Sequence, residues 1–287
     1  MSLGNDKHSL YMKLLRCVPN TLTLCNSLCG YIAILITLQA YKAQNIKDMI
    51  TSFVWSACMI LFAMIFDMFD GFSARKLKVS SDYGIQMDSL ADMTTFGVAP
   101  AVIVAVMAHN IRHIERTGQF IPICIFCAIY LGCAALRLAT YNIKAMSGEH
   151  GDPKYFTGLP SPGAASAICS FILFFATKHD RHNILVFQYL PIYAAFVGIL
   201  MVSQVPYLHF GRWITSAIHS KNKIIIIVIA LFFWLFTGVT LNPFLFPFIV
   251  INGYVVIGIV SYFATKMGFF DTNESINHKK SVSKEEK

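Results

Sequence analysis

Charged residues are scarce in this chain of 287 residues: they make up 13% of it, whereas 56% of its residues are hydrophobic. Water-soluble domains of ordinary composition carry about 25% charged residues, so the expected solvent for most of this chain is lipid. The chain also lacks internal repeats and low-complexity segments, and no polar stretch is long enough to form a soluble domain. The scarcity of charge therefore predicts an integral membrane protein.

Apolar stretches recur along nearly the whole chain, and each has roughly the 20 residues that a helix needs to cross a bilayer. We expect eight spanning helices, at residues 21–41, 50–75, 86–108, 120–143, 160–177, 186–208, 223–241 and 244–265. The first stretch has no small-residue cleavage pattern, so it is expected to remain as a helix. The predicted fold class is all-α, a polytopic membrane helical bundle.

The positive charges alternate between successive loops. If the N-terminus is cytoplasmic, seventeen lysines and arginines lie in inside segments and six in outside loops. This bias follows the positive-inside rule and predicts that both termini face the cytoplasm. The net charge of +8 is thereby accounted for without a nucleic-acid partner. We expect the lysine-rich tail, from about residue 271, to contact anionic membrane lipid.

Eight cysteines could indicate disulfides or a metal site, but seven of them lie within or beside the apolar stretches. Buried free thiols are the expected state in such positions, even for the closely spaced pair Cys124 and Cys127.

Four aspartates, Asp67, Asp70, Asp88 and Asp92, lie in the second and third predicted helices. A charged residue within a membrane span costs about 2.5–3.5 kcal/mol on insertion scales, so four acids in two adjacent spans point to a function. At 100° per residue, the two acids of each helix lie on one face. The polar residues 76–83 can form a short turn, which would bring these two faces together.

Four facing carboxylates repel one another unless cations neutralise them, and oxygen ligands suit Mg²⁺, Mn²⁺ or Ca²⁺ better than zinc. Gly71, Ala74 and Gly84 lie among the acids and would let a flat ligand approach the backbone. Arg75 adds a positive fork suited to phosphate. Together these residues indicate a divalent metal site that binds a nucleotide diphosphate. The acids could instead form buried ion pairs with Arg75, Lys76 and Lys78, or line a path for cation transport.

The spacing of these residues, D-x2-D-G-x2-A-R-x8-G-x3-D-x3-D, is similar to the signature of the CDP-alcohol phosphotransferase superfamily. Residues 19–30, 135–142 and 156–165 resemble the phosphatidylserine synthases of this superfamily. Within 135–142, Thr140 and Tyr141 stand where those enzymes usually have Arg-Phe. The resemblance covers about residues 15–208.

The resemblance implies a domain organisation. A six-helix catalytic core at 21–208 follows a cytoplasmic segment at 1–20, and two additional helices at 209–265 precede the basic tail at 266–287. It also suggests a homodimer.

The implied reaction transfers the phosphatidyl group of CDP-diacylglycerol to the hydroxyl of L-serine and yields phosphatidylserine and CMP. Two divalent ions, Mg²⁺ or Mn²⁺, are implied, one held by Asp67, Asp70 and Asp88, the other by Asp92 together with Asp67 and Asp88. Asp92 is also the implied general base. The implied CDP-diacylglycerol site consists of Asn20, Thr23, Asn26, Asp70, Gly71, Ala74, Arg75 and Gly84.

Arg137 is the best candidate for binding the serine carboxylate, because a cation within a membrane helix needs an acidic partner and its fork suits a carboxylate. A pairing of Arg137 with a site aspartate or a phosphate is an equal alternative. Asn142, Thr157 and Ser161 are further candidates for the serine pocket.

The sequence leaves several functions open. A second class of serine-transferring enzymes forms a covalent intermediate on the histidine of an H-x-K-x4-D motif. The most similar stretch here has His219 and Lys221, but Ile226 stands where the motif requires the aspartate. Direct attack by serine is therefore favoured. The alternatives are a related transferase with glycerol phosphate or inositol phosphate as acceptor and, outside enzymes, a cation transporter.

Overall fold

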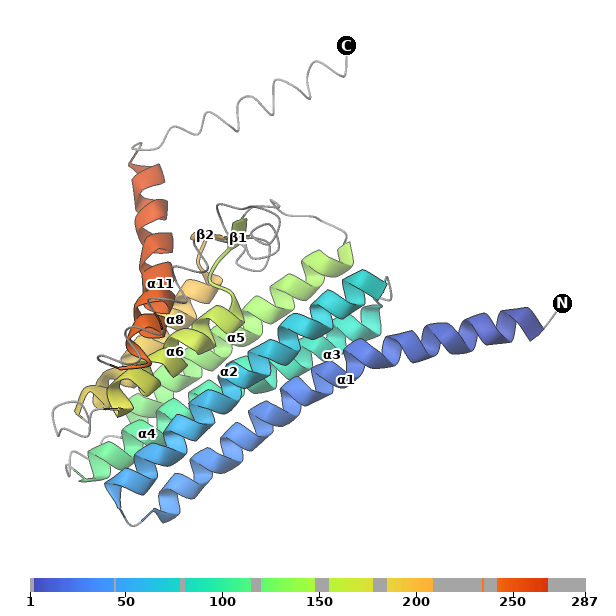
Figure 1. The fold of residues 1–287 in the computed structure, drawn as a ribbon. Coiled ribbons are helices and arrows are strands. Elements are labelled where there is room, and N and C mark those ends of the chain that lie inside the picture. Colours follow the sequence, from blue (N-terminus) through green and yellow to red (C-terminus); the bar gives the residue numbers. More distant parts are fainter. Residues whose placement is uncertain are drawn as a thin grey trace.

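Figure 1 shows the fold of the protein in a computed structural model. The structure describes residues 3–43, 45–77, 81–114, 120–147, 155–177, 185–208, 234 and 242–267. The helices are α1 (Leu3–Gln39), η1 (Ala40–Lys42), α2 (Ile46–Leu77), α3 (Asp82–Asp92), η2 (Met93–Val98), α4 (Ala99–Ile114), α5 (Phe120–Ser147), α6 (Ser161–Ala176), η3 (Phe187–Tyr189), α8 (Leu190–Val202) and α11 (Leu245–Lys266). Two short strands, β1 (Tyr155–Thr157) and β2 (Pro206–Leu208), pair in an antiparallel manner.

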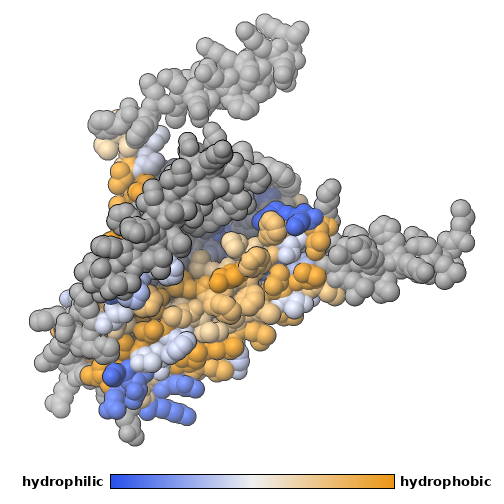
Figure 2. Space-filling model, viewed as in Figure 1, coloured by the Kyte–Doolittle hydropathy of each residue, from blue (hydrophilic) through white to orange (hydrophobic). Residues whose placement is uncertain are grey.

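The helical membrane fold predicted from the sequence is confirmed. Five helices are long and apolar enough to cross a membrane, and α6 and the η3–α8 segment are shorter apolar helices. Seven of the eight predicted spans correspond to these helices, whereas 223–241 lies, apart from Trp234, outside the described residues. Figure 2 shows hydrophobic side chains over the middle of the visible face of the bundle and hydrophilic residues at its two ends. The protein is an integral membrane protein.

The first helix begins much earlier than the predicted apolar span. α1 starts at Leu3, whereas the apolar span of membrane length runs from Cys17 through the rest of α1 and η1 to Lys42. Pro19 lies inside this helix. The polar residues before Cys17 also form a helix, so the start of the apolar span does not mark the start of α1. In Figure 1 the N-terminal part of α1 extends beyond the bundle.

The third predicted span is one continuous helical rod with a change of winding in the middle. Ser81 caps its start, since its Oγ accepts a hydrogen bond from the backbone N–H of Gly84 at 3.2 Å. The π-helical segment η2 follows directly after Asp92. Such segments are rare and occur frequently at functional sites. Tyr130 of α5 donates a hydrogen bond from its hydroxyl to the carbonyl oxygen of Phe96 in η2, at 2.6 Å.

A close crossing joins α1 to this π-helical segment. A Cβ atom on Gly30 would lie 2.5 Å from Thr95 Oγ1 and 2.8 Å from Thr95 Cα, so only glycine fits. The Thr95 hydroxyl donates a hydrogen bond to the backbone carbonyl of Asn26 at 3.0 Å. These contacts fix the rotation and height of α1 relative to the acids on α3.

The start of α6 is set by two prolines. Pro160 has an extended conformation at the N-cap, and Pro162 occupies the first turn, where the missing N–H has no cost. Just before this point the chain is held by the β1–β2 pair and by a hydrogen bond from Leu159 N–H to the carbonyl of Leu200, at 3.0 Å. The small sheet was not predicted, because three-residue strands leave no periodic pattern.

All eight cysteines are free; Cys17 is exposed, and of the seven expected to be buried, Cys25, Cys58, Cys124 and Cys133 are half-buried. Cys29, Cys127 and Cys169 are buried among apolar residues of the core.

Candidate active site

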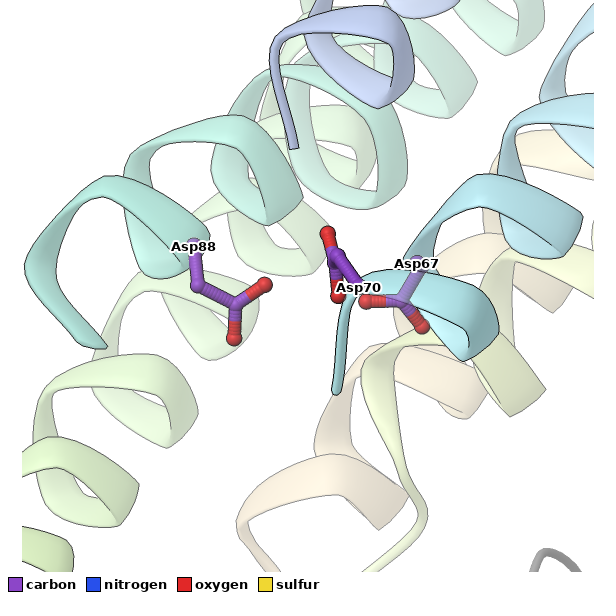
Figure 3. A group of neighbouring side chains, drawn as sticks. All are labelled: Asp67, Asp70 and Asp88. Carbon is purple, nitrogen blue, oxygen red and sulfur yellow. The ribbon is translucent and has the colours of Figure 1, made fainter. Parts of the chain in front are cut away.

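Three of the four aspartates converge between α2 and α3. Figure 3 shows Asp67 and Asp70 of α2 and Asp88 of α3 with their carboxylates directed toward one another. One carboxylate oxygen from each lies within 4.8 Å of the others, a spacing that could hold a metal ion. The facing of the two helices, predicted from the angular positions of the acids, is confirmed.

The chemistry of this trio fits a hard divalent cation. The Oδ1 atom of Asp88 is buried without any hydrogen-bond partner, although buried carboxylate oxygens are normally paired. Three carboxylate oxygens offer the ligand type that Mg²⁺ and Mn²⁺ prefer. A cation bound there would satisfy the unpaired oxygen and remove the mutual repulsion of the acids.

The first helix supplies polar side chains to two of the acids. Thr23 is buried, and its hydroxyl donates a hydrogen bond to Asp70 Oδ2 at 2.9 Å. Asn26, also buried, donates from Nδ2 to Asp92 Oδ1 at 3.2 Å, and its own Oδ1 has no partner. Thr23 and Asn26 are thus brought to the site, as predicted. Asn20 lies on the same helix and is half-buried.

Asp92 lies outside the trio and is also buried. Its side chain is 8% exposed, and it interacts directly with the side chain of Asp67. It therefore contacts Asn26 on one side and the trio, through Asp67, on the other. The π-helical segment begins at the next residue, Met93.

The small residues of the signature lie at the edge of this acidic site. Gly71, Ala74 and Gly84 are half-buried, whereas Arg75 is exposed. The guanidinium of Arg75 folds back over Gly71, since a Cβ on Gly71 would lie 3.3 Å from Arg75 Nη1. This places a positive group beside the acids on the face of α2 that the signature predicted.

These positions do not favour buried ion pairs as the role of the acids. Arg75 is exposed, and the ammonium of Lys76 lies over the ring of Phe72 at 5.6 Å from its centroid. The third cation considered for such pairs, Lys78, lies outside the described residues.

Arg137 of α5 reaches the same site from a third helix. Its Nη1 donates a hydrogen bond to Ser161 Oγ at 3.0 Å, and its charge interacts with Asp92 and Asp67. The Nε atom of Arg137 is buried and has no hydrogen-bond partner. Arg137 and Ser161, both proposed for the serine pocket, are therefore in contact, and one donor of the arginine remains available.

The other two residues proposed for that pocket lie elsewhere. Asn142 is about 140° around α5 from Arg137, and its Oδ1 accepts a hydrogen bond from Ser89 of α3 at 2.6 Å. Asn142 and Ser89 line a groove of about 200 Å³ between α3 and α5, together with apolar side chains. Thr157 is exposed on β1. The structure thus brings two of the four candidates together and separates the others.

Two residues that contact candidate site residues, Thr95 and Ser89, were not predicted from the sequence. The Thr95 hydroxyl donates a hydrogen bond to the backbone carbonyl of Asn26, and the Ser89 hydroxyl donates one to the side chain of Asn142. Serines and threonines within apolar helices usually bond to their own backbone, so their positions alone carry no signal.

Residues 16–205 match the model of the CDP-alcohol phosphatidyltransferase family. The chain belongs to this family. The chain is 33% identical over 212 residues to the CDP-diacylglycerol–serine O-phosphatidyltransferase of Bacillus subtilis, covering 68% of this chain and 98% of that protein. It is 32% identical over 197 residues to the archaetidylserine synthase of Methanothermobacter thermautotrophicus, covering 66% and 69% of the two chains.

A third relative, the CDP-diacylglycerol–serine O-phosphatidyltransferase of Methanocaldococcus jannaschii, is 32% identical over 177 residues, which is 60% of this chain and 74% of that protein. The CDP-alcohol phosphatidyltransferase match includes the acidic site, Arg137 and Ser161, and ends before β2. The helix α11 is therefore an addition to the part that this protein shares with the family model.

Proposed function

We infer that the protein is a membrane transferase that moves the phosphatidyl group of CDP-diacylglycerol to L-serine, forming phosphatidylserine and CMP. The observation that carries this function is the convergence of three carboxylates beside Asp92, Arg75 and Arg137 in a chain of the CDP-alcohol phosphatidyltransferase family. Serine as acceptor is supported by the names of the relatives in Bacillus subtilis and Methanocaldococcus jannaschii.

The donor site is proposed at the ends of α2 and α3, with α1 beside it. Asp67, Asp70 and Asp88 would hold Mg²⁺ or Mn²⁺, and Asp92 would join Asp67 and Asp88 around a second ion. Such ions polarise a diphosphate and offset the charge on the departing CMP. Arg75, folded over Gly71, supplies a fixed positive fork for a phosphate. The remaining donor-site residues are proposed to be Asn20, Thr23, Asn26, Asp70, Ala74 and Gly84.

The acceptor reacts by direct displacement. The serine hydroxyl oxygen forms a new bond to the phosphorus that carries the diacylglycerol, and the bond from that phosphorus to the oxygen of CMP breaks. The hydroxyl proton passes to the carboxylate of Asp92, the proposed general base. Asn26 orients this carboxylate through its hydrogen bond at 3.2 Å.

The carboxylate of serine is proposed to bind Arg137, whose Nε is buried and unpaired. Ser161 holds the guanidinium in place through Nη1. Thr157 and Asn142 remain proposals for the periphery of this pocket. The Oδ1 atom of Asn142 already accepts a hydrogen bond from Ser89.

Acceptors that carry a phosphate are less well supported. Glycerol phosphate or inositol phosphate would need additional cations, whereas Arg75 and Arg137 are the two whose charges interact with Asp67 in the described part of the chain. A cation transporter is disfavoured because the acids lie in the last three turns of α2 and in α3, at one end of the bundle and not at its middle.

We propose that this end of the bundle faces the cytoplasm, where free serine is available and CMP is released. The proposal rests on the positive-inside bias of the lysines and arginines. The six-span core at 21–208 would contain the whole catalytic site, and a homodimer remains a proposal from the family resemblance.

The test is an acceptor assay with the purified full-length protein in mixed micelles. With CDP-diacylglycerol, Mg²⁺ or Mn²⁺ and labelled acceptors, we expect labelled phosphatidylserine and an equal amount of CMP. A chelator should abolish the reaction, and either metal should restore it. Labelling of glycerol phosphate but not of serine would refute the acceptor and leave the family assignment intact.

A further inference from the structure

A proline interrupts the helical hydrogen bonds just after the π-helical segment η2. Pro100 is the second residue of α4 and has no backbone N–H, so it cannot donate to the carbonyl oxygen of Phe96, four residues before it. The backbone N–H of Ala99 donates to the carbonyl of Thr94, five residues before it, as in a π-helix. The Phe96 carbonyl therefore lacks the donor that a regular α-helix would supply.

A tyrosine of another helix supplies a donor to this carbonyl. Tyr130 of α5 is fully buried, and its hydroxyl donates a hydrogen bond to the carbonyl oxygen of Phe96 at 2.6 Å. Helix α8 packs directly on the backbone of this tyrosine, since a Cβ on Gly198 would lie 2.8 Å from Tyr130 Cα. The Tyr130 side chain is thus held in place, and its hydroxyl takes the position of the N–H that Pro100 lacks.

The winding of η2 decides the direction of Asp92, the residue immediately before it. A turn closed by bonds between residues five apart holds one residue more than an α-helical turn, and one residue corresponds to about 100° of rotation. If η2 were wound as a regular α-helix, α3 would turn by about this angle relative to α4. In the π-helical winding, Asp92 accepts a hydrogen bond from Asn26 at 3.2 Å, and Thr95 within η2 donates to the carbonyl of Asn26.

We propose that Tyr130 is a positioning residue for Asp92. Its hydroxyl replaces the missing N–H of Pro100, stabilises the π-helical winding of η2, and so directs the Asp92 carboxylate toward Asn26 and the trio of acids. Tyr130 acts through the backbone of η2 and has no part in binding substrate. The proposal rests on the proposed function, because it explains how the proposed general base is held.

The test uses the full-length protein in mixed micelles with CDP-diacylglycerol, serine and Mg²⁺, and measures CMP release and the midpoint of thermal unfolding. Tyr130→Phe removes only the hydroxyl. We expect kcat to fall about 10²-fold, the loss typical of a reacting group misplaced by about 1 Å. The KM for serine should stay near that of the unmodified protein, because Arg137 and Ser161 lie on α5 and α6 and not on the helix that turns. An unchanged kcat would overturn the proposal.

A second variant separates positioning from simple stabilisation. Pro100→Ala, added to Tyr130→Phe, supplies an N–H four residues after Phe96, so η2 can wind as a regular α-helix with this carbonyl bonded. The double variant should unfold at a higher temperature than Tyr130→Phe, while its kcat remains low. Recovery of kcat together with the unfolding temperature would show that the hydroxyl only satisfies a buried carbonyl. A double variant no more stable than Tyr130→Phe would show that the hydroxyl does not replace the N–H of Pro100. Either result would overturn the proposal.

Tyr193→Phe is the matched control. The Tyr193 hydroxyl on α8 donates a hydrogen bond to Asn252 Oδ1 on α11, and these two helices carry none of the proposed site residues. Its loss should lower the unfolding midpoint and leave kcat unchanged. A fall in kcat as large as that of Tyr130→Phe would remove the specific role of Tyr130. Failure of the proposed function would be seen separately, as an unmodified protein that releases no CMP with serine, and the unfolding midpoints would still test the link between Tyr130 and Pro100.

Discussion

Asp92 differs from the other three aspartates in its surroundings. Asp67, Asp70 and Asp88 face one another with oxygens within 4.8 Å, whereas Asp92 is hydrogen-bonded to Asn26 and lies beside Asp67. A buried and oriented carboxylate beside the proposed cation site, but outside the trio, is placed to receive a proton while the trio keeps its cation. At the scale of single residues, the acids therefore differ in their surroundings, and we propose that Asp92 alone adds the role of general base to that of a ligand.

We predict that Asp92→Asn lowers kcat by about 10²–10⁴-fold, the usual contribution of a positioned general base. Mn²⁺ binding, measured by electron paramagnetic resonance, should be retained in part, because the trio is intact. The control is Asp82→Asn, an exposed acid in the first turn of α3, which should keep full activity. Undiminished CMP release by Asp92→Asn would remove this residue as the base.

At the scale of secondary-structure elements, the crossing of α1 with the π-helical segment η2 positions the side chain that contacts Asp92. Gly30 lets the two helices touch, and Thr95 then binds the carbonyl of Asn26, the residue that orients Asp92. A shift of α1 by a fraction of an ångström would move Asn26 and Thr23 together relative to the acids.

Gly30→Ala should therefore impair both stability and turnover. The new methyl group would lie 2.5 Å from Thr95 Oγ1 and 2.8 Å from the Thr95 backbone, so the helices must separate. Overpacking of this kind costs about 1–3 kcal/mol. We expect a lower midpoint of thermal unfolding and a reduced kcat, measured by a thiol-independent thermal assay and by CMP release. Gly132→Ala on α5, where a Cβ would meet nothing within 4 Å, should change neither.

Element positions could be predicted from the sequence to different degrees. The apolar spans and the facing of Asp67 and Asp70 with Asp88 followed from hydropathy and from the period of the helix, which depend on local sequence alone. The π-helical segment after Asp92, the early start of α1 and the attachment of α11 depend on contacts between distant segments. Asn142 illustrates the same limit, because nothing in its local sequence indicates that Ser89 of another helix donates a hydrogen bond to its Oδ1.

The whole molecule has its acids at one end of an apolar bundle, so its orientation in the membrane decides which compartment supplies the acceptor. The short turn between α2 and α3 is expected in the cytoplasm, and the turn between α1 and α2 on the opposite side. These two turns provide a direct test of the proposed topology.

We predict opposite labelling of two single cysteines placed in a cysteine-free protein. Lys42→Cys, at the turn after α1, should react in intact cells with a maleimide reagent that cannot cross membranes. Ser81→Cys, at the cap of α3, should react only after the cells are opened. Mass shift on a gel measures both. The reverse pattern would place the acidic site on the outer face and would contradict a cytoplasmic site.

The visible face of the bundle in Figure 2 is apolar over its middle, as a surface in contact with lipid would be, and this has a kinetic consequence. A diacyl donor dissolved in the bilayer reaches the site by diffusion in the two dimensions of the membrane, whereas serine reaches it by diffusion in three dimensions through water. For the proposed reaction, the variable that sets the rate is therefore the mole fraction of donor among the surrounding lipids. Adding inert lipid would dilute the donor and slow the enzyme, even when the amount of donor in the tube is constant.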